Sequence, residues 1–167
     1  MSHLPEVWLR GETTPGLVPQ LQPAANALLQ ASEEIQNMLV DLPQHLLWEK
    51  PAGVAAIGFH LKHICGVLDR LLTYAEGNQL ADSQLAYLKK ETIDTGETAN
   101  ELLKLLEKQI SLTIERYKNF KENELTAFRG VGRKNLPSNV LGLCFHAAEH
   151  TMRHTGQLLV TIKVLKT

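Results

Sequence analysis

The C-terminal third of the chain carries three histidines at successive four-residue spacing, His146, His150 and His154. On an α-helix, positions four residues apart differ by about 40° around the axis, so the three imidazoles share one stripe. Leu143 and Ala147 occupy the same stripe, which is therefore expected to face the core. A buried neutral imidazole needs partners for its ring nitrogens, and one divalent metal ion satisfies several imidazoles at once. The spacing favours a metal site over three separate core histidines bonded to their neighbours.

Helix geometry limits which of these histidines can share an ion. His146 and His154 are about 12 Å apart along a helix axis, whereas Zn–N bonds are about 2.0–2.1 Å long. One ion cannot bind both, so the pair is either His146 with His150 or His150 with His154. His150 belongs to both pairs, and at least one further ligand must come from another segment.

A second helix-patterned segment, ending before Gly77, supplies two more histidines, His60 and His63. The apolar pattern alone favours His60 as the inward group, because His63 lies at the margin of the apolar half. A residue at that margin can still face an adjacent helix, so both remain candidates. The polar face of this segment consists of Lys62, Gly66, Asp69, Arg70 and Thr73.

Two other metal motifs fit the sequence less well. The string from His146 to His150 matches His-x-x-Glu-His, in which two histidines bind zinc and the glutamate activates water. The peptidases that carry this motif are far larger than this chain, and Glu149 lies about 100° from the histidine stripe. The Glu-x-x-His motif of ferritin-like di-metal bundles is absent from the sequence. Neither class is favoured.

Composition excludes several partners. The 167 residues are 44% hydrophobic, which suits one domain with a proper core. A net charge of −1 offers no footprint for nucleic acid or an anionic membrane. The amino terminus lacks a signal-peptide pattern, and no run approaches the roughly 18 apolar residues of a membrane span. Cys65 and Cys144 are interpreted as buried apolar fillers in a reducing compartment. We expect a cytoplasmic protein.

The segments that must position the histidines follow from proline, glycine and the apolar periodicity. Residues 1–22 are punctuated by proline and glycine and predict an extended N-terminal arm, packed on the surface by Val7, Trp8 and Leu17. Residues 23–167 form the single domain. The expected elements are four long helices at about 23–42, 55 or 57 to 76, 97–120 and 138–164, a short helix or turn at 83–90, a structural loop at 121–137 and a helix N-cap at Ser138. This pattern predicts an all-α four-helix bundle.

The last helix has a second apolar line about 180° from its histidines. A helix that is apolar on two sides needs burial on two sides, so we expect one side to form a homodimer interface. The alternative is burial by the N-terminal arm or by the 121–137 loop. The residues of this line are Leu141, Phe145, Ala148, Met152 and Leu159.

Taken in order, His63 on the second helix followed by Gly77, and then His150-x-x-x-His154-x-Gly156-Gln157 on the last helix, resemble the DinB-like superfamily of bacterial bundles. The resemblance covers the chain from about residue 20 onward. It implies a four-helix bundle with a three-histidine site for a divalent metal, usually zinc or nickel, frequently in a homodimer. The ligands it implies are His63, His150 and His154, because the distance from His63 to the helix-ending Gly77 fits the family pattern. His60, His146 and Gln157 would then support the ligands or line the pocket.

Three protein nitrogens leave a coordination position open, as in catalytic zinc sites. Relatives in this family include thiol-dependent S-transferases and isomerases. We therefore expect a metal-dependent enzyme that acts on a small molecule. It is either a thiol-dependent transferase, with a low-molecular-weight thiol as cosubstrate, or a hydrolase. The alternative is a non-catalytic metal-binding or stress-related interaction protein. A third possibility is a metal-free bundle with core histidines.

Overall fold

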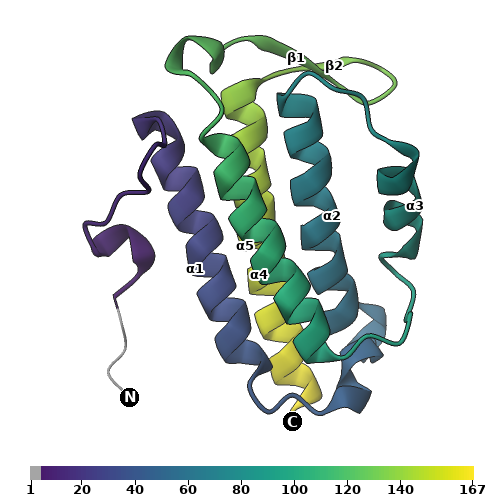
Figure 1. Cartoon of the computed structure of the whole chain (residues 1–167). Coiled ribbons are helices and arrows are strands. Elements are labelled where there is room, and N and C mark those ends of the chain that lie inside the picture. The colour runs from purple at the N-terminus through teal and green to yellow at the C-terminus, as the bar shows by residue number, and fades with distance from the viewer. Residues whose placement is uncertain (1–4) are drawn as a thin grey trace.

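Four long helices form the body of the molecule in a computed structural model that describes residues 5–167 (Figure 1). α2 packs against both α4 and α5, and α1 packs against the same two helices. The shorter α3 (Asp82–Lys90) lies outside this group, against α2. The bundle helices are α1 (Gln22–Leu39), α2 (Ile57–Ala75), α4 (Ala99–Tyr117) and α5 (Val140–Leu165). The predicted all-α four-helix bundle is confirmed.

Local sequence signals explain where the helices that carry the histidines end and begin. α2 stops at Gly77, whose φ of +82° suits a residue without a Cβ. The N–H of Gly77 donates to the carbonyl of Tyr74, and the N–H of Asn78 to that of Thr73, which satisfies the last carbonyls of the helix. α5 begins after Asn139, whose side chain accepts a hydrogen bond of 2.7 Å from the N–H of Gly142. The predicted N-cap at Ser138 is therefore wrong by one residue.

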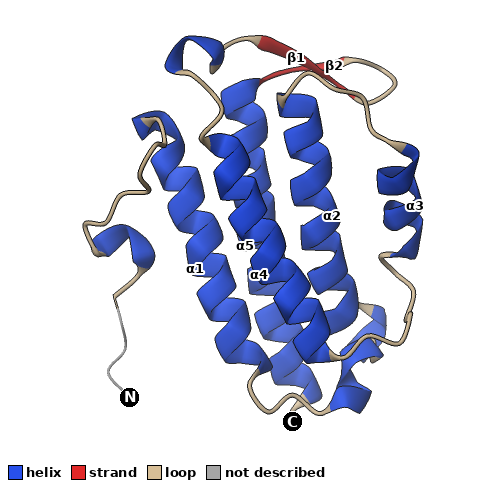
Figure 2. Cartoon of the chain, in the orientation of Figure 1, coloured by secondary structure: helices blue, strands red, loops and turns tan. Residues whose placement is uncertain are grey.

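A small β-hairpin replaces part of the loop predicted at 121–137 (Figure 2). Strands β1 (Phe128–Val131) and β2 (Leu136–Asn139) pair antiparallel, with Phe128 opposite Asn139. The hairpin lies over one end of α2 and α5, which it contacts. Each strand has only four residues, and a glycine and a proline lie opposite each other. So short a pattern, interrupted by residues that are depleted in strands, gives little periodicity to detect.

The N-terminal arm precedes α1 in the chain and lies against it. It contains two short 3₁₀ turns, Val7–Leu9 and Pro19–Leu21. Val7 is buried, and the guanidinium of Arg10 makes two hydrogen bonds of 2.7 Å with the carboxylate of Glu33 on α1. Trp8, which was expected to pack the arm, is 63% exposed. Its indole N–H donates to the carboxylate of Glu6 within the arm.

The core lies between the four helices and is almost entirely aliphatic. Tyr117 on α4 is fully buried, and its hydroxyl donates a 2.8 Å hydrogen bond to the carbonyl of Cys144 on α5. Cys65 and Cys144 are both buried and free. Two 3₁₀ segments, Gln44–Trp48 and Pro51–Gly53, connect α1 to α2 at one end of the bundle.

No single helix within residues 5–167 has the length and apolar composition needed to cross a membrane. One bent pair, Gln44–Gly53 with Ile57–Ala75, passes both criteria together, with an angle of 92° between its parts. Its longer member, α2, lies inside the bundle between α4 and α5.

Candidate metal centre

The ligands implied by the family resemblance come together between α2 and α5. His63 from α2 and His150 and His154 from α5 each offer one ring nitrogen, and these nitrogens all lie within 4.8 Å of one another. The Nε2 atoms of His63 and His150 are 3.1 Å apart. Two nitrogens bound tetrahedrally to one zinc ion would be about 3.3 Å apart, given Zn–N bonds of about 2.0–2.1 Å. The spacing therefore fits a shared ion with little movement.

His60 is the innermost histidine, with only 2% of its surface exposed, as the apolar pattern of the helix predicted. Its Nδ1 atom lies 2.9 Å from Nδ1 of His154, close enough for a hydrogen bond between the rings. That contact occupies Nδ1 of His154 and leaves its Nε2 atom free. His60 thus supports the ring of His154 and is outside the group of three nitrogens that could hold an ion.

A carboxylate that the sequence reasoning missed holds the ring of His63. Glu91, the residue after α3, is 2% exposed, and its Oε2 atom lies 2.7 Å from Nδ1 of His63. Its other oxygen accepts a 2.6 Å hydrogen bond from the guanidinium of Arg70. A carboxylate only accepts hydrogen bonds, so His63 donates from Nδ1. Histidine ligands of metals generally donate their second nitrogen to such a group.

Burial keeps most of this cluster uncharged. Desolvation, followed by the neighbouring His63, lowers the pKa of His60 and of His150 to about 4, and that of His154 to about 3. Neutral rings retain the lone pairs that bind metal. The Nδ1 atom of His150 is buried without a hydrogen-bond partner among the described residues. The donor set and its charge state both suit a divalent ion.

These pKa values predict that the metal-free protein loses stability as the pH falls. The unfolded chain binds protons at His60 and His154 near their ordinary pKa of 6.5, whereas the folded chain does so only near pH 4 or below. The free energy of unfolding should therefore fall between pH 7 and pH 5, by up to about 1.4 kcal/mol per pH unit for each buried ring. Thermal unfolding in the presence of a chelator measures this slope.

An exposed histidine provides the control for that measurement. His45 lies on the surface, and a His45→Gln variant should show the same pH slope as the wild type. A melting temperature that stays constant or rises from pH 7 to pH 5 would contradict the buried, neutral state of the cluster.

The other predicted site residues lie farther out. His146 does not share the buried stripe as expected, because its side chain is 50% exposed and its Nδ1 atom lies 3.3 Å from Glu149. Glu149 also pairs with Arg153 on the surface, so the His-x-x-Glu-His interpretation gains no support. Gln157 is exposed beside a cavity of about 560 Å³ that also borders His60. Of the two pairs that the spacing on α5 leaves open, His150 with His154 is the one whose ring nitrogens lie close enough, together with His63, to hold one ion.

A second cavity, of about 340 Å³, borders the cluster on the side of His63 and His150. His146 and Arg70 reach its wall, and the rest of the lining is apolar. The apolar residues come from α2, α3 and the segment between them, and include Val67, Leu71, Tyr74 and Leu88.

Solved structures share this architecture at low sequence identity. A conserved protein from Enterococcus faecalis is 20% identical, with a TM-score of 0.65, over 85% of this chain and 94% of its own. A protein from Streptococcus pneumoniae is 18% identical, with a TM-score of 0.62, over 87% and 90%. A DinB-like protein from Bacillus cereus is 19% identical, with a TM-score of 0.61, over 83% and 91%. At these identities the similarity shows the fold alone.

Most of the chain matches a protein-family model in sequence. No curated protein matches it in sequence. The model of the DinB superfamily matches residues 21–158, a stretch that contains α1, α2, α4 and all three histidines of the cluster. The resemblance inferred from the histidine and glycine spacing is thus confirmed, and the chain belongs to the DinB superfamily.

Proposed function

We propose that this protein is a divalent-metal-dependent enzyme whose metal is held by His63, His150 and His154. The observation that carries the proposal is the convergence of three ring nitrogens within 4.8 Å, without a fourth histidine among them. His60 is turned towards His154, and His146 is half exposed beside Glu149. One coordination position therefore remains for a ligand from solution, which is typical of catalytic sites.

The chain's own residues prepare the site for such chemistry. When bound, the ion would supply Lewis acidity, which acidifies a coordinated water or thiol so that it can act as a nucleophile near neutral pH. Glu91 and His60 hold the rings of His63 and His154 by their Nδ1 atoms. Three imidazoles are borderline ligands that suit zinc, nickel, copper or iron, and we propose zinc or nickel, the two metals that the family resemblance implies.

The cavity beside His63 and His150 supports a small-molecule substrate. Its volume of about 340 Å³ and its largely apolar lining suit a compact molecule with an apolar body. A molecule in this cavity contacts two of the three proposed ligands. We propose a reaction of the thiol-dependent transferase type or a hydrolysis, with a low-molecular-weight thiol as the cosubstrate in the first case.

Metal analysis followed by a substrate screen tests this function. The purified wild-type protein is expected to retain about one zinc or nickel per chain. Loaded with that metal, it should accelerate the reaction of a low-molecular-weight thiol with an electrophilic acceptor, or the hydrolysis of an ester, and His150→Ala should not. A wild-type protein that carried its full metal content but gave the same reaction rates as His150→Ala in every such assay would favour a non-catalytic metal-binding or interaction protein. A wild-type protein without affinity for metal would leave only a helical bundle with core histidines.

We also propose that the outer face of α5 forms a homodimer interface. Support comes from apolar side chains that the rest of the described chain leaves uncovered: Phe145 is 64% exposed, and Leu159 and Val160 are also exposed. Neither residues 5–22 of the N-terminal arm nor the hairpin buries them, although Ala148 from the same predicted line is buried. Analytical ultracentrifugation should show a dimer that Phe145→Glu converts to a monomer. A monomeric wild type at micromolar concentration would overturn this.

We place the protein in the cytoplasm. Two free cysteines support a reducing compartment, since Cys65 and Cys144 lie buried without a disulfide. Burial raises the pKa of both thiols to about 12, so neither is a reactive nucleophile at neutral pH. Fractionation of the native host with a cytoplasmic marker tests the location.

A further inference from the structure

Glu91 is a buried carboxylate that joins two residues of α2 from outside the bundle. It lies directly after α3, and its two oxygens contact the guanidinium of Arg70 and the imidazole of His63 at 2.6 and 2.7 Å. Both contacts are sheltered from solvent, because the side chains of Arg70 and His63 are 11% and 19% exposed. A buried charge is costly unless it is paired and hydrogen-bonded. The charge of Glu91 meets both conditions, because Arg70 carries the opposite charge and each oxygen has a hydrogen-bond partner.

The surface of α2 is shaped to admit this carboxylate. Gly66 lies one turn after His63 and one turn before Arg70, in the interior of the helix. A Cβ atom at Gly66 would lie 2.1 Å from Oε1 of Glu91 and 2.5 Å from a guanidinium nitrogen of Arg70. Real side chains do not approach this closely, so only glycine leaves room for the pair.

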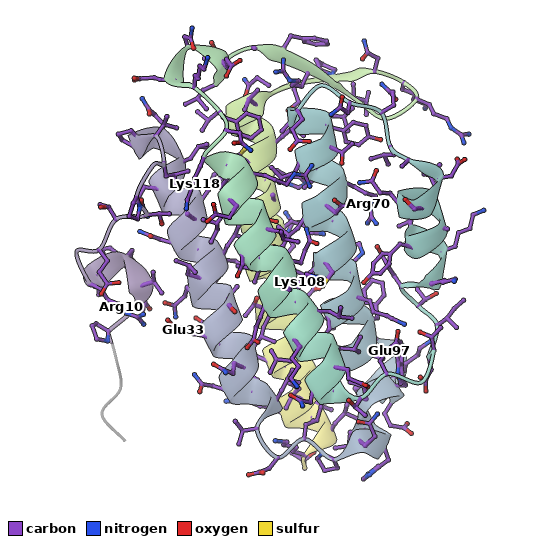
Figure 3. The ribbon with its side chains drawn as sticks, viewed as in Figure 1. Arg10, Glu33, Arg70, Glu97, Lys108 and Lys118 are labelled. Carbon is purple, nitrogen blue, oxygen red and sulfur yellow. The ribbon has the colours of Figure 1, made fainter. Side chains whose placement is uncertain are left out.

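A second anchor fixes the segment that follows Glu91. Lys62, the residue before His63, is buried, and its ammonium group donates to the carbonyl of Ile93 at 3.0 Å. It also donates to the hydroxyl of Thr95 and to the carboxylate of Glu97. Figure 3 shows Arg70 and Glu97 at two levels along α2, on the side of α3. The segment from 91 to 97 is therefore attached to α2 at Lys62, just before His63, and at Arg70, two turns after it.

From this geometry we infer that Glu91, clamped by Arg70 and admitted by Gly66, is the positioning residue that sets the tautomer and orientation of His63 for metal binding. The inference rests on the proposed metal site. Because Nδ1 of His63 donates to Glu91, the proton is kept off Nε2, which faces His150 at 3.1 Å. Nε2 is thus offered to the ion, and the ring does not have to reorient when metal arrives.

Metal affinity in a Glu91→Gln variant tests the inference. The substitution keeps the shape of the side chain but removes its charge, and its amide can no longer accept at both positions. Loss of such an outer partner typically weakens metal binding by about 10- to 100-fold. Competition with a chromophoric chelator measures zinc affinity. Should Glu91→Gln fail to fold, Glu91→Asp keeps the charge for Arg70 but shortens the reach to His63, and it should give a smaller loss.

A distant pair provides the matched control. Glu33 accepts from Arg10 in a similar two-fold contact, on the opposite side of the molecule from Arg70 (Figure 3). Glu33→Gln breaks a carboxylate–arginine pair as well, yet zinc affinity should stay within about two-fold of the wild type. An equal loss in both variants would show a general effect of stability and would overturn the positioning role.

The tautomer of His63 tests the inference without any metal. In the metal-free wild type at neutral pH, nitrogen-15 NMR should find His63 protonated at Nδ1, and in Glu91→Gln the population should shift towards Nε2. This result would stand even if the wild type bound no metal, an outcome that would overturn the proposed function separately. An unchanged tautomer together with unchanged zinc affinity in Glu91→Gln would overturn the role of Glu91.

Discussion

Replacing His150 by alanine is expected to abolish stoichiometric metal binding while leaving the bundle folded. Structural zinc sites are worth about 10–16 kcal/mol in all, so each of their four ligands contributes roughly 2.5–4 kcal/mol. The loss of one ligand should weaken binding by roughly 100- to 1,000-fold. The side chain is only partly buried, and alanine favours the helix, so the fold should tolerate the change. Elemental analysis and chelator competition measure the result.

The neighbouring histidine is the matched control for this substitution. His146 precedes His150 by one turn of the same helix, but its side chain is half exposed and lies outside the group of three nitrogens. His146→Ala should therefore bind metal as tightly as the wild type. If His150→Ala kept its metal, or if His146→Ala lost it, the assigned ligand set would be wrong.

Replacing Gly66 by alanine is expected to weaken metal binding although the substitution touches no ligand. The new Cβ would collide with Glu91 and Arg70, so the carboxylate must move away from α2 and release His63. We expect zinc affinity to fall by about 10- to 100-fold, as for other losses of a ligand's outer partner. The clash should also cost about 1–3 kcal/mol of stability, which at least offsets the roughly 1 kcal/mol that alanine adds to a helix interior. Chemical denaturation and chelator competition measure the two effects.

Another helical glycine separates this effect from helix propensity. Gly156 lies in α5, and a Cβ atom there would meet nothing within 4 Å. Gly156→Ala should therefore leave zinc affinity unchanged and raise stability by up to about 1 kcal/mol. A Gly66→Ala protein that bound zinc like the wild type and became as stable as Gly156→Ala would refute the close packing of Glu91 on α2.

The helices could be predicted because their signals are local. The apolar periodicity, Pro23 near the start of α1 and Gly77 after α2 all act within one or two turns of the chain. The hairpin was missed because its pairing joins two four-residue strands with little pattern of their own. The N-cap was placed at Ser138 because serine and asparagine both suit that position, and the backbone decides between them.

The cluster of histidines was only partly accessible to sequence reasoning. Spacing on α5 left two ligand pairs open, and the partner on α2 was chosen by family resemblance over the apolar pattern. His146 was misplaced because a stripe of about 80° spans both the buried and the exposed edge of α5. Glu91 was missed because it lies 28 residues from His63 and belongs to another element. The one signal of its presence was Gly66, a helix-interior glycine beside a histidine, which indicates close approach but not by which group.

A crystal structure of the zinc-loaded protein, with anomalous data collected at the zinc edge, tests the central claim most directly. We predict a single ion about 2.0–2.1 Å from one ring nitrogen each of His63, His150 and His154, with Glu91 still bonded to Nδ1 of His63 and with a solvent molecule as the fourth ligand. An ion bound through His60 or His146, or no ion between α2 and α5, would contradict it.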